Sequence, residues 1–259
     1  MTSLVLYDAR GVPSPRRVKM CLHEKQLSYQ IRWLDLGLME QKRPDFLVLN
    51  PTGLVPVLQH DGHTLYDSNA INEYLDEVFP FPSLVPSDAM GKAKMRMWFA
   101  FEADWARPFR DIVYETLAKD RVRNADLPIE AIVNTIHVHG TNPVYTQIVE
   151  KLYHAPTNKD LVEEQRQLIF EKLSGMERAL EDGRHWLCGT DFTLADICLA
   201  PRLAMLPAIG VDDLGARYPA IAAFLKRIAE RDCWAASDVQ PKAGETARMM
   251  SSPRLSVAM

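Results

Sequence analysis

The sequence contains no long run of apolar residues and no segment that resembles an export signal. A helix that crosses a bilayer needs about 20 consecutive, mostly apolar residues, and no stretch of this chain comes near that length. Residues 1–8, MTSLVLYD, lack both the basic start and the apolar middle of a secretory leader. We therefore expect a cytoplasmic protein that is not embedded in a membrane.

Cysteine is scarce as well, and its four residues stand far apart at Cys21, Cys188, Cys198 and Cys233. No Cys-x-x-Cys pair occurs, and no Cys/His cluster has the spacing of zinc ligands. We therefore expect reduced, buried thiols and no bound metal. The chain also contains neither G-x-G-x-x-G nor a Walker sequence, which excludes the common nucleotide-binding motifs.

The chain also has no large excess of positive or negative residues. Thirty Lys and Arg residues face 34 Asp and Glu residues, for a formal net charge of −4. This balance predicts neither nucleic acid nor an anionic membrane as a partner. The composition, 47% hydrophobic and 25% charged over 259 residues, is typical of a globular chain with one large domain or two smaller ones.

Residues 1–80 alternate strand and helix patterns. Short apolar or alternating runs predict strands at residues 4–7, 29–33, 55–59 and 63–66, and the Asp61-Gly62 pair predicts a hairpin between the last two. Helical spacing or an opening proline predicts helices after residue 14, after residue 44 and after residue 68. The predicted order β-α-β-α-β-β-α implies a small sheet covered by helices.

The second half of the chain has almost only helical periodicity. Prolines at positions 80, 82 and 86 indicate a linker at residues 81–89. Helical patterns follow near residues 95–109, 161–180, 200–206 and 221–228, with helices and a connecting loop at residues 120–160. From residue 237 the apolar periodicity is lost, which predicts a loosely held tail at 237–259. The fold class is thus an α/β domain followed by an all-α bundle.

The first candidate functional residue is Ser14, between the first strand and the first helix. Ser14 followed by Pro15 is a typical N-cap and first helical residue, and capping alone explains the pair. A cap uses an oxygen lone pair, however, and leaves the hydroxyl hydrogen free to donate. A hydroxyl at a helix N-terminus can therefore also stabilise an anion such as a thiolate.

Two further segments carry weaker signals. Residues 50–58, NPTGLVPVL, place a proline at a strand start; a plain turn explains it, while a cis Val55–Pro56 bond would offer the Val55 backbone to a peptide-like ligand. In the segment YDSNAI, Ser68 is the expected N-cap of a helix. Capping suffices there too, but the same turn can bind a carboxylate, with Asp67 accepting from an ammonium group.

The joint order of these segments resembles the cytosolic glutathione transferase family. The serine-containing first turn, the segment NPxGxVPxL, the Asp-Ser turn and a helical second half all occur in the family's order. A fourth signature is FTLADI at residues 192–197, where Thr193 and Asp196 form a predicted capping box with Phe192 and Ile197 as a hydrophobic staple. In the family this element supports folding of the helical domain. The resemblance covers about residues 3–235.

The resemblance implies a thioredoxin-like, glutathione-binding domain at residues 1–80, a substrate-binding helical domain at 90–236, and a homodimer. It implies a cis Val55–Pro56 bond, with the Val55 backbone pairing the cysteinyl part of glutathione. Asp67 and Ser68 match the turn that holds the γ-glutamyl end. Gln41 and Lys42 match the region that reaches the glycyl carboxylate, although a solvated surface lysine remains an alternative for Lys42.

Ser14 departs from the common pattern, since many serine-type members carry the hydroxyl two positions earlier, where this chain has Val12. The glutathione-dependent β-aryl etherases of lignin degradation are more similar, with a serine at the Ser14 position and extra length in the helical domain. The resemblance thus implies that Ser14 stabilises the glutathione thiolate. Arg16 and Arg17 either assist through their charge or are solvated.

The implied reaction is attack of the thiolate on an apolar electrophile, with an aryloxide or halide as the leaving group, or addition to an activated double bond. An aromatic stripe of this kind is usually core, but four residues are candidates for the substrate-binding wall: Pro13, Trp105, Phe109 and Tyr114. Two other interpretations stay open. One is a non-catalytic ligand-binding or regulatory protein of the same fold; the other, a thiol–disulfide oxidoreductase or dehydroascorbate reductase, would need a cysteine in the first turn, whereas Cys21 lies within the helix.

Overall fold

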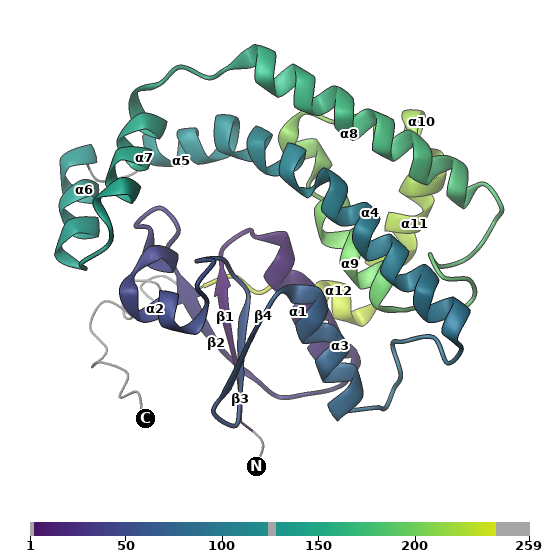
Figure 1. Ribbon diagram of the computed structural model, residues 1–259. Helices are drawn as coiled ribbons and strands as arrows, with labels where there is room; N and C mark the ends of the chain where they lie inside the picture. Colours follow the sequence, from purple (N-terminus) through teal and green to yellow (C-terminus); the bar gives the residue numbers. More distant parts are fainter. Residues whose placement is uncertain (1–2, 124–127, 242–259) are drawn as a thin grey trace.

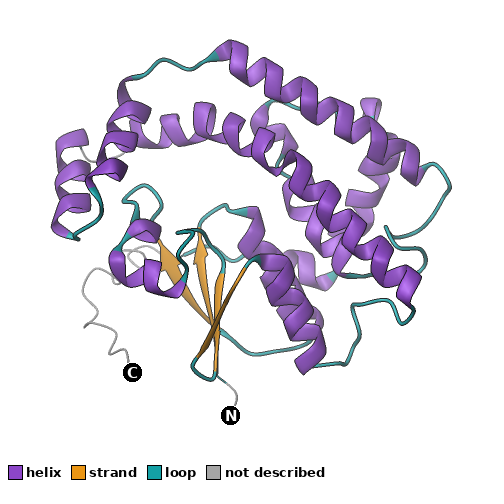
Figure 2. Cartoon of the chain, viewed as in Figure 1, coloured by secondary structure: helices purple, strands orange, loops and turns teal. Residues whose placement is uncertain are grey.

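The computed structural model describes residues 3–123 and 128–241, which form a small sheet domain followed by a larger set of helices (Figures 1 and 2). The sheet domain contains β1 (Leu4–Ala9), α1 (Pro13–Glu24), β2 (Gln30–Leu34), a 3-10 turn (Glu40–Lys42), α2 (Pro44–Leu49), β3 (Val57–His60), β4 (His63–Tyr66) and α3 (Ser68–Val78). This order confirms the predicted thioredoxin-like domain. The strands lie in the order β2-β1-β3-β4, with β2 parallel to β1 and β3 antiparallel to both of its neighbours.

Alternation along β1 separates the two faces of the sheet. Leu4 and Leu6 belong to a core cluster with the apolar residues of α1 and α3, which cover one face. Tyr7 packs on the opposite face in a separate cluster with Phe46 of α2. The first cluster continues without interruption into the helical domain, so α1 and α3 are buried between the sheet and the second domain.

The connection between the domains is held by a buried lysine. Lys25, at the end of α1, forms an ion pair of 2.7 Å with Asp76 of α3. Its ammonium also donates to the carbonyl oxygens of Phe79 (2.7 Å) and Pro82 (2.9 Å). Because all three acceptors surround one desolvated cation, the connection is tied to the sheet domain at its start.

The helical domain confirms the predicted all-α second half. Its helices are α4 (Ala89–Val113), α5 (Lys119–Arg123), α6 (Ile129–Val138), α7 (Pro143–His154), α8 (Lys159–Leu180), α9 (Leu194–Leu203), α10 (Leu214–Arg217), α11 (Pro219–Ala229) and α12 (Asp232–Ala236), with a π-helical turn (Tyr114–Ala118) and a 3-10 turn (Leu206–Ile209). Gly140 takes a positive φ of 69° in the turn between α6 and α7. No helix in the described ranges is long and apolar enough to cross a membrane.

The centre of the helical domain is α9, in which every residue is buried. The predicted capping box is present: the Thr193 hydroxyl accepts from Ala195 N, and the Asp196 carboxylate accepts from Thr193 N at 2.8 Å. Asp196 also accepts from Leu187 N at 2.8 Å, and burial raises its pKa to about 6. The helix therefore begins at Leu194, earlier than the apolar pattern at residues 200–206 suggests.

Two predicted N-caps are wrong by one or two residues. The N-cap of α1 is Val12, which has no side-chain cap, and Pro13 rather than Pro15 is the first helical residue. The N-cap of α3 is Asp67, whose carboxylate accepts from Asn69 N (2.9 Å) and Ala70 N (3.0 Å). An aspartate tolerates the positive φ of 72° found at this position, and its oxygen reaches the free N–H groups of the first turn.

The start of the predicted tail lies against α1. Arg16 stacks on the Trp234 ring, 3.6 Å from its centroid, and donates to Ser237 Oγ and to the Trp234 carbonyl oxygen. Lys19 donates to the Val239 carbonyl oxygen, and Ser237 itself is buried. Ser237 and the Val239 carbonyl oxygen thus contact α1, while residues 242–259 of the predicted tail lie outside the described residues.

Candidate functional site

Strand register brings the predicted site segments to one edge of the sheet. Ala9 pairs with Leu34, and Val57 lies between Tyr7 and Tyr66. The chain that follows β1 and leads into α1, the residues just before β3, and the start of α3 therefore meet at the same edge (Figure 1). The segments around Ser14, Val55 and Asp67 are distant in sequence but adjacent in the fold.

Ser14 is the second residue of α1 and is half-buried. Pro13 and Pro15 flank it and have no backbone N–H, so Ser14 carries the first-turn N–H that has no intrahelical partner. Within the described part of the chain its hydroxyl makes no hydrogen bond. Both the N–H and the O–H of this residue are consequently available, at the positive end of a twelve-residue helix, to an anion.

The segment before β3 presents backbone groups rather than side chains. The Val55–Pro56 peptide bond is cis, and Pro56 is buried while Val55 is half-buried. Asn50 holds the preceding turn by donating to the Leu54 carbonyl oxygen at 2.8 Å. No turn or loop hydrogen bond among the described residues uses the N–H or C=O of Val55, so both remain able to pair with a peptide.

Asp67 and Ser68 stand side by side at the start of α3 but differ in exposure. Asp67 is exposed, and its capping bonds use only Oδ1, which leaves Oδ2 free to accept from a cation. Ser68 is buried, and its hydroxyl accepts from Arg17 Nη1 at 3.4 Å. Since that contact uses a lone pair, the Ser68 hydroxyl hydrogen can donate to a carboxylate.

Gln41 and Lys42 lie in the turn between β2 and α2. Gln41 is buried, and Lys42 is half-buried with its ammonium donating to the Thr52 carbonyl oxygen at 2.9 Å. Burial lowers the pKa of Lys42, and the charge of Arg110 lowers it further. Lys42 is therefore a partly desolvated cation next to the segment that leads to Val55, rather than a freely solvated surface lysine.

A buried ion triad joins the site to the helical domain. Glu102 of α4 pairs with Arg17 of α1 and with Arg202 of α9, and all three side chains are buried. Burial works against the ionised form of Glu102, but the two guanidinium groups outweigh it and hold its pKa below the usual value. The expectation of a solvated Arg17 is thus wrong, because this residue lies on the inner face of α1 and supports Ser68.

Two of the four predicted substrate-wall residues lie in the core. Trp105 and Phe109 are 0% and 3% exposed and pack edge to face in the core, with the Arg202 guanidinium over both rings. Both side chains are buried, so the structure corrects their assignment to a substrate-facing surface. Tyr114 is 45% exposed, and Pro13 is half-buried beside Ser14.

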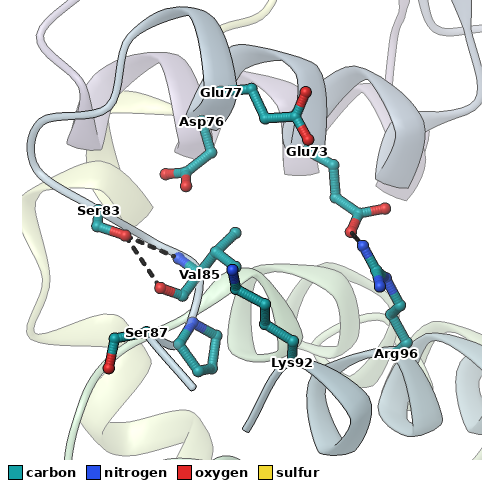
Figure 3. A pocket seen from close by; sticks show the side chains of 9 residues that line it. Glu73, Asp76, Glu77, Ser83, Val85, Ser87, Lys92 and Arg96 are labelled. Carbon is teal, nitrogen blue, oxygen red and sulfur yellow. Dashed lines mark hydrogen bonds and ion pairs between the residues drawn. The ribbon is translucent and has the colours of Figure 1, made fainter. Parts of the chain in front are cut away.

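A pocket of about 200 Å³ lies elsewhere, between α3, the connection and α4 (Figure 3). Acidic residues of α3, among them Glu73 and Glu77, line one side, and Lys92 and Arg96 of α4 line the other. Arg96 pairs with Glu73 at 2.8 Å. None of the predicted site residues lines this pocket, so it is separate from the edge of the sheet that carries Ser14.

Neither Cys21 nor Cys198 has the properties of a redox-active thiol. Burial raises the pKa of Cys21 strongly and that of Cys198 to about 12, and both are fully buried. Within residues 3–123 and 128–241, no cluster of three His, Cys, Asp or Glu side chains has an arrangement that could hold a metal ion. Cys21 therefore lacks the exposure and the thiolate character of a reactive cysteine.

Sequence inspection missed the positions of Arg17 and of the Asp67 cap. Arg17 precedes Met20 by three residues and Cys21 by four, and this spacing places it on the buried face of α1. Its burial could therefore have been predicted from the sequence. The positive φ of Asp67 had no comparable signal, because glycine is the usual marker of that conformation.

Comparison with known proteins agrees with this arrangement. A family model described as "Glutathione S-transferase, N-terminal domain" matches residues 13–78, and one described as "Glutathione S-transferase, C-terminal domain" matches residues 137–232. The two matches together span more than half of the chain. The protein belongs to the glutathione S-transferase family.

Several known proteins align with most of the chain. Glutathione S-transferase F4 of Arabidopsis thaliana is 26% identical, over 88% of this chain and 83% of the relative. A stringent starvation protein A homolog of Haemophilus influenzae is 29% identical, over 83% and 81%. Protein LigF of a Sphingobium species is 28% identical over 68% of each chain.

The crystal structure of LigF, described as a β-etherase, shares the fold with a TM-score of 0.77. The superposition covers 91% of this chain and 98% of LigF at 24% identity. At this level of identity the similarity shows a shared fold.

Proposed function

We propose that this glutathione S-transferase family member is a transferase in which Ser14 stabilises the thiolate of bound glutathione. One observation carries the proposal: three segments lie at the same edge of the sheet. They are the start of α1, where the Ser14 hydroxyl has no hydrogen-bond partner among the described residues, the Val55 backbone, which is likewise unpaired there, and the Asp67–Ser68 turn. Each group matches a different part of an extended tripeptide.

The binding mode follows from the chemistry of these groups. The N–H and C=O of Val55 pair with the cysteinyl backbone, as a neighbouring strand would. The free Asp67 oxygen accepts from the γ-glutamyl ammonium, and Ser68 donates to the adjacent carboxylate. Lys42, with Gln41 beside it, supplies the positive charge for the glycyl carboxylate.

The magnitudes of the two contributions, from Ser14 and from the tip of α1, reach the required range without a general base. A free thiol has a pKa near 8.5, and lowering it by about 2 units requires about 2.7 kcal/mol. A hydrogen bond to a charged group contributes roughly 1.5–3 kcal/mol, and a helix N-terminus adds about 0.3–1 kcal/mol. The Ser14 hydroxyl and the tip of α1 together therefore account for ionisation at neutral pH.

The reaction is a nucleophilic displacement. The thiol proton leaves to solvent, and the thiolate electron pair forms a C–S bond to an electrophilic carbon. The C–O bond of an aryl ether, or a carbon–halogen bond, breaks, and the leaving group departs with the bonding pair as aryloxide or halide. The similarity to LigF supports a β-aryl ether as the electrophile. We retain half-buried Pro13 and exposed Tyr114 as the wall residues for it.

We further propose that the enzyme acts as a homodimer. The family resemblance supports this, and Met90 and Met97 of α4 are 66% and 69% exposed, which leaves an apolar surface on that helix. Met90 and Met97 are one heptad apart and so lie on the same face of α4, where a second copy of the chain would cover them.

A second candidate function is ligand binding without catalysis. Two observations favour it: Val12 stands where many serine-type members carry their hydroxyl, and one of the similar proteins carries the name stringent starvation protein A rather than that of a transferase. Such a protein would bind glutathione without lowering the pKa of the thiol.

Substitution of Ser14 by alanine tests the proposed role. We expect S14A to lower the glutathione-dependent turnover of an aryl halide or β-aryl ether at least tenfold, because a charged hydrogen bond of roughly 1.5–3 kcal/mol is lost. The affinity for glutathione should change little, since Val55 and Asp67 are intact.

Ser87→Ala is the matched control, because Ser87 is exposed and lies in the separate pocket of Figure 3. Turnover of that variant should equal that of the parent. Full activity of S14A would show that another group activates the thiol.

A further inference from the structure

The turn that carries Lys42 is covered by helices α6 and α7. Leu38 and Met39, which precede this turn, pack against a buried apolar cluster of the helical domain that includes Ile132, Ile136 and Val149. Figure 1 shows α6 and α7 beyond the end of α4, on the side of α2. The helical domain therefore contacts the sheet domain at a second place, far from the triad of Glu102.

The Lys42 side chain is confined on three sides. Its ammonium donates to the Thr52 carbonyl oxygen, and it passes so close to Gly53 that a Cβ at Gly53 would lie 2.6 Å from Lys42 Nζ. On the third side is the ring of Tyr145, from α7, with its centroid 5.4 Å from the same nitrogen. This distance is within the range of a cation–π contact.

The confined Lys42 ammonium still has N–H donors that are not used by the protein residues described. An ammonium group has three donors, and Thr52 takes one of them. No carboxylate in the described part of the chain bonds to Lys42, although Arg110 adds positive charge nearby. The arrangement lacks the anion that a partly buried ammonium requires.

The place of this ammonium matches one end of the tripeptide. With the γ-glutamyl end at Asp67 and the cysteine at Val55, the chain of glutathione continues past Gly53 and Thr52 toward Lys42. In glutathione only the glycine follows the cysteine, and its Cα lies 3.8 Å from the cysteine Cα. The glycyl carboxylate is therefore the group that reaches Lys42.

We propose that Tyr145 is a positioning residue for that carboxylate: its ring holds the Lys42 ammonium in place, so that the site selects a thiol peptide with a free carboxylate one residue beyond cysteine. The inference rests on the proposed glutathione site and adds to it a contribution from α7. Tyr145 touches Lys42 and acts through it.

The test compares glutathione with its glycyl ethyl ester, which keeps the thiol and loses the terminal charge. The parent should prefer the free acid in kcat/KM. Tyr145→Leu keeps an apolar side chain but removes the π face, so we expect KM for glutathione to rise about two- to fivefold. Its kcat at saturating glutathione and its KM for the ester should stay within about twofold of the parent values.

Tyr145→Phe retains the ring and should restore the parent preference. Val144→Ala is the matched control on the same helix, because Val144 is 53% exposed, and it should behave as the parent. If Y145L keeps the parent's preference for the free acid, or if Y145F loses it as Y145L does, the role of the ring is wrong.

Should Y145L not fold, the parent and Y145F still test the inference: equal kcat/KM for acid and ester in the parent, or loss of the preference in Y145F, would contradict it, while transfer to glutathione would still stand. Absence of any glutathione binding by the parent would instead overturn the proposed function, and the role of Tyr145 with it.

Discussion

In the proposed site the two carboxylate oxygens of Asp67 have separate roles. Oδ1 accepts from Asn69 N and Ala70 N and caps α3, whereas Oδ2 is the oxygen that we propose for the γ-glutamyl ammonium of glutathione. The residue also holds a positive φ of 72°, a conformation that proteins retain mainly where a ligand or a sharp turn requires it.

Asp67→Asn separates the cap from the charge. Asparagine is an equally good N-cap and tolerates positive φ, so we expect the melting temperature to stay close to that of the parent. Loss of the charged hydrogen bond should weaken glutathione binding about tenfold or more, measured by calorimetric titration.

A glutathione analogue without the γ-glutamyl amino group is the control ligand for this substitution. Its affinity should be the same for the parent and for D67N. If D67N binds glutathione as tightly as the parent, Asp67 is only a cap.

Residue patterns predicted Ser14, the Asp67–Ser68 turn and the 50–58 segment as site residues because their types and order are local features. They did not predict which residue caps each helix, since Val12 and Asp67 are placed by the geometry of the sheet edge rather than by capping preference. Trp105 and Phe109 were misassigned for a related reason: a helical stripe of aromatic residues has the same spacing in a pocket wall and in a core.

Among the elements, α9 depends most on a single local motif. Asp196 satisfies Thr193 N, the Thr193 hydroxyl and Leu187 N, all of them buried. The motif was evident from FTLADI, so the position of this helix start could be predicted from sequence, whereas its complete burial could not.

Removal of that carboxylate should destabilise the whole helical domain. We expect Asp196→Ala to lower the free energy of unfolding by about 2–4 kcal/mol, because a cap is lost and buried donors are left without partners. Chemical denaturation at neutral pH measures the change.

Asp191→Ala, at an exposed position five residues earlier, is the control and should change the free energy of unfolding by less than about 0.5 kcal/mol. Similar losses for the two variants would mean that the capping box contributes little.

At the scale of the whole molecule, the triad of Arg17, Glu102 and Arg202 joins α1 to the helical domain. No run of sequence connects these residues, and their pairing arises only when α4 and α9 pack on α1. The contacts of the triad could therefore be found only from the tertiary structure, whereas the order of the two domains could be predicted from the sequence.

Glu102→Gln leaves two buried guanidinium groups without their anion. We expect a loss of about 3–5 kcal/mol in the free energy of unfolding, compared with less than about 1 kcal/mol for Asp104→Asn. Asp104 is the matched control on the same helix, since its 2.9 Å pair with Lys172 is exposed.

The pH dependence gives a second readout of the same triad. Because the folded-state pKa of Glu102 lies below its ordinary value of 4.5, the contribution of the triad is complete above about pH 4.5. It is lost as the pH falls through the lowered pKa, so the parent should lose stability in that range and E102Q should lose less. Parallel acid profiles would contradict a stabilising triad.

The central claim is that Ser14 and the tip of α1 ionise the thiol of bound glutathione, and the ultraviolet absorbance of the thiolate as a function of pH measures this directly. The account predicts a thiol pKa about 2 units below the free value in the parent, and a return toward about 8.5 in S14A, with glutathione bound in both. Binding with an unshifted thiol pKa in the parent, or the same lowered pKa in S14A, would contradict it.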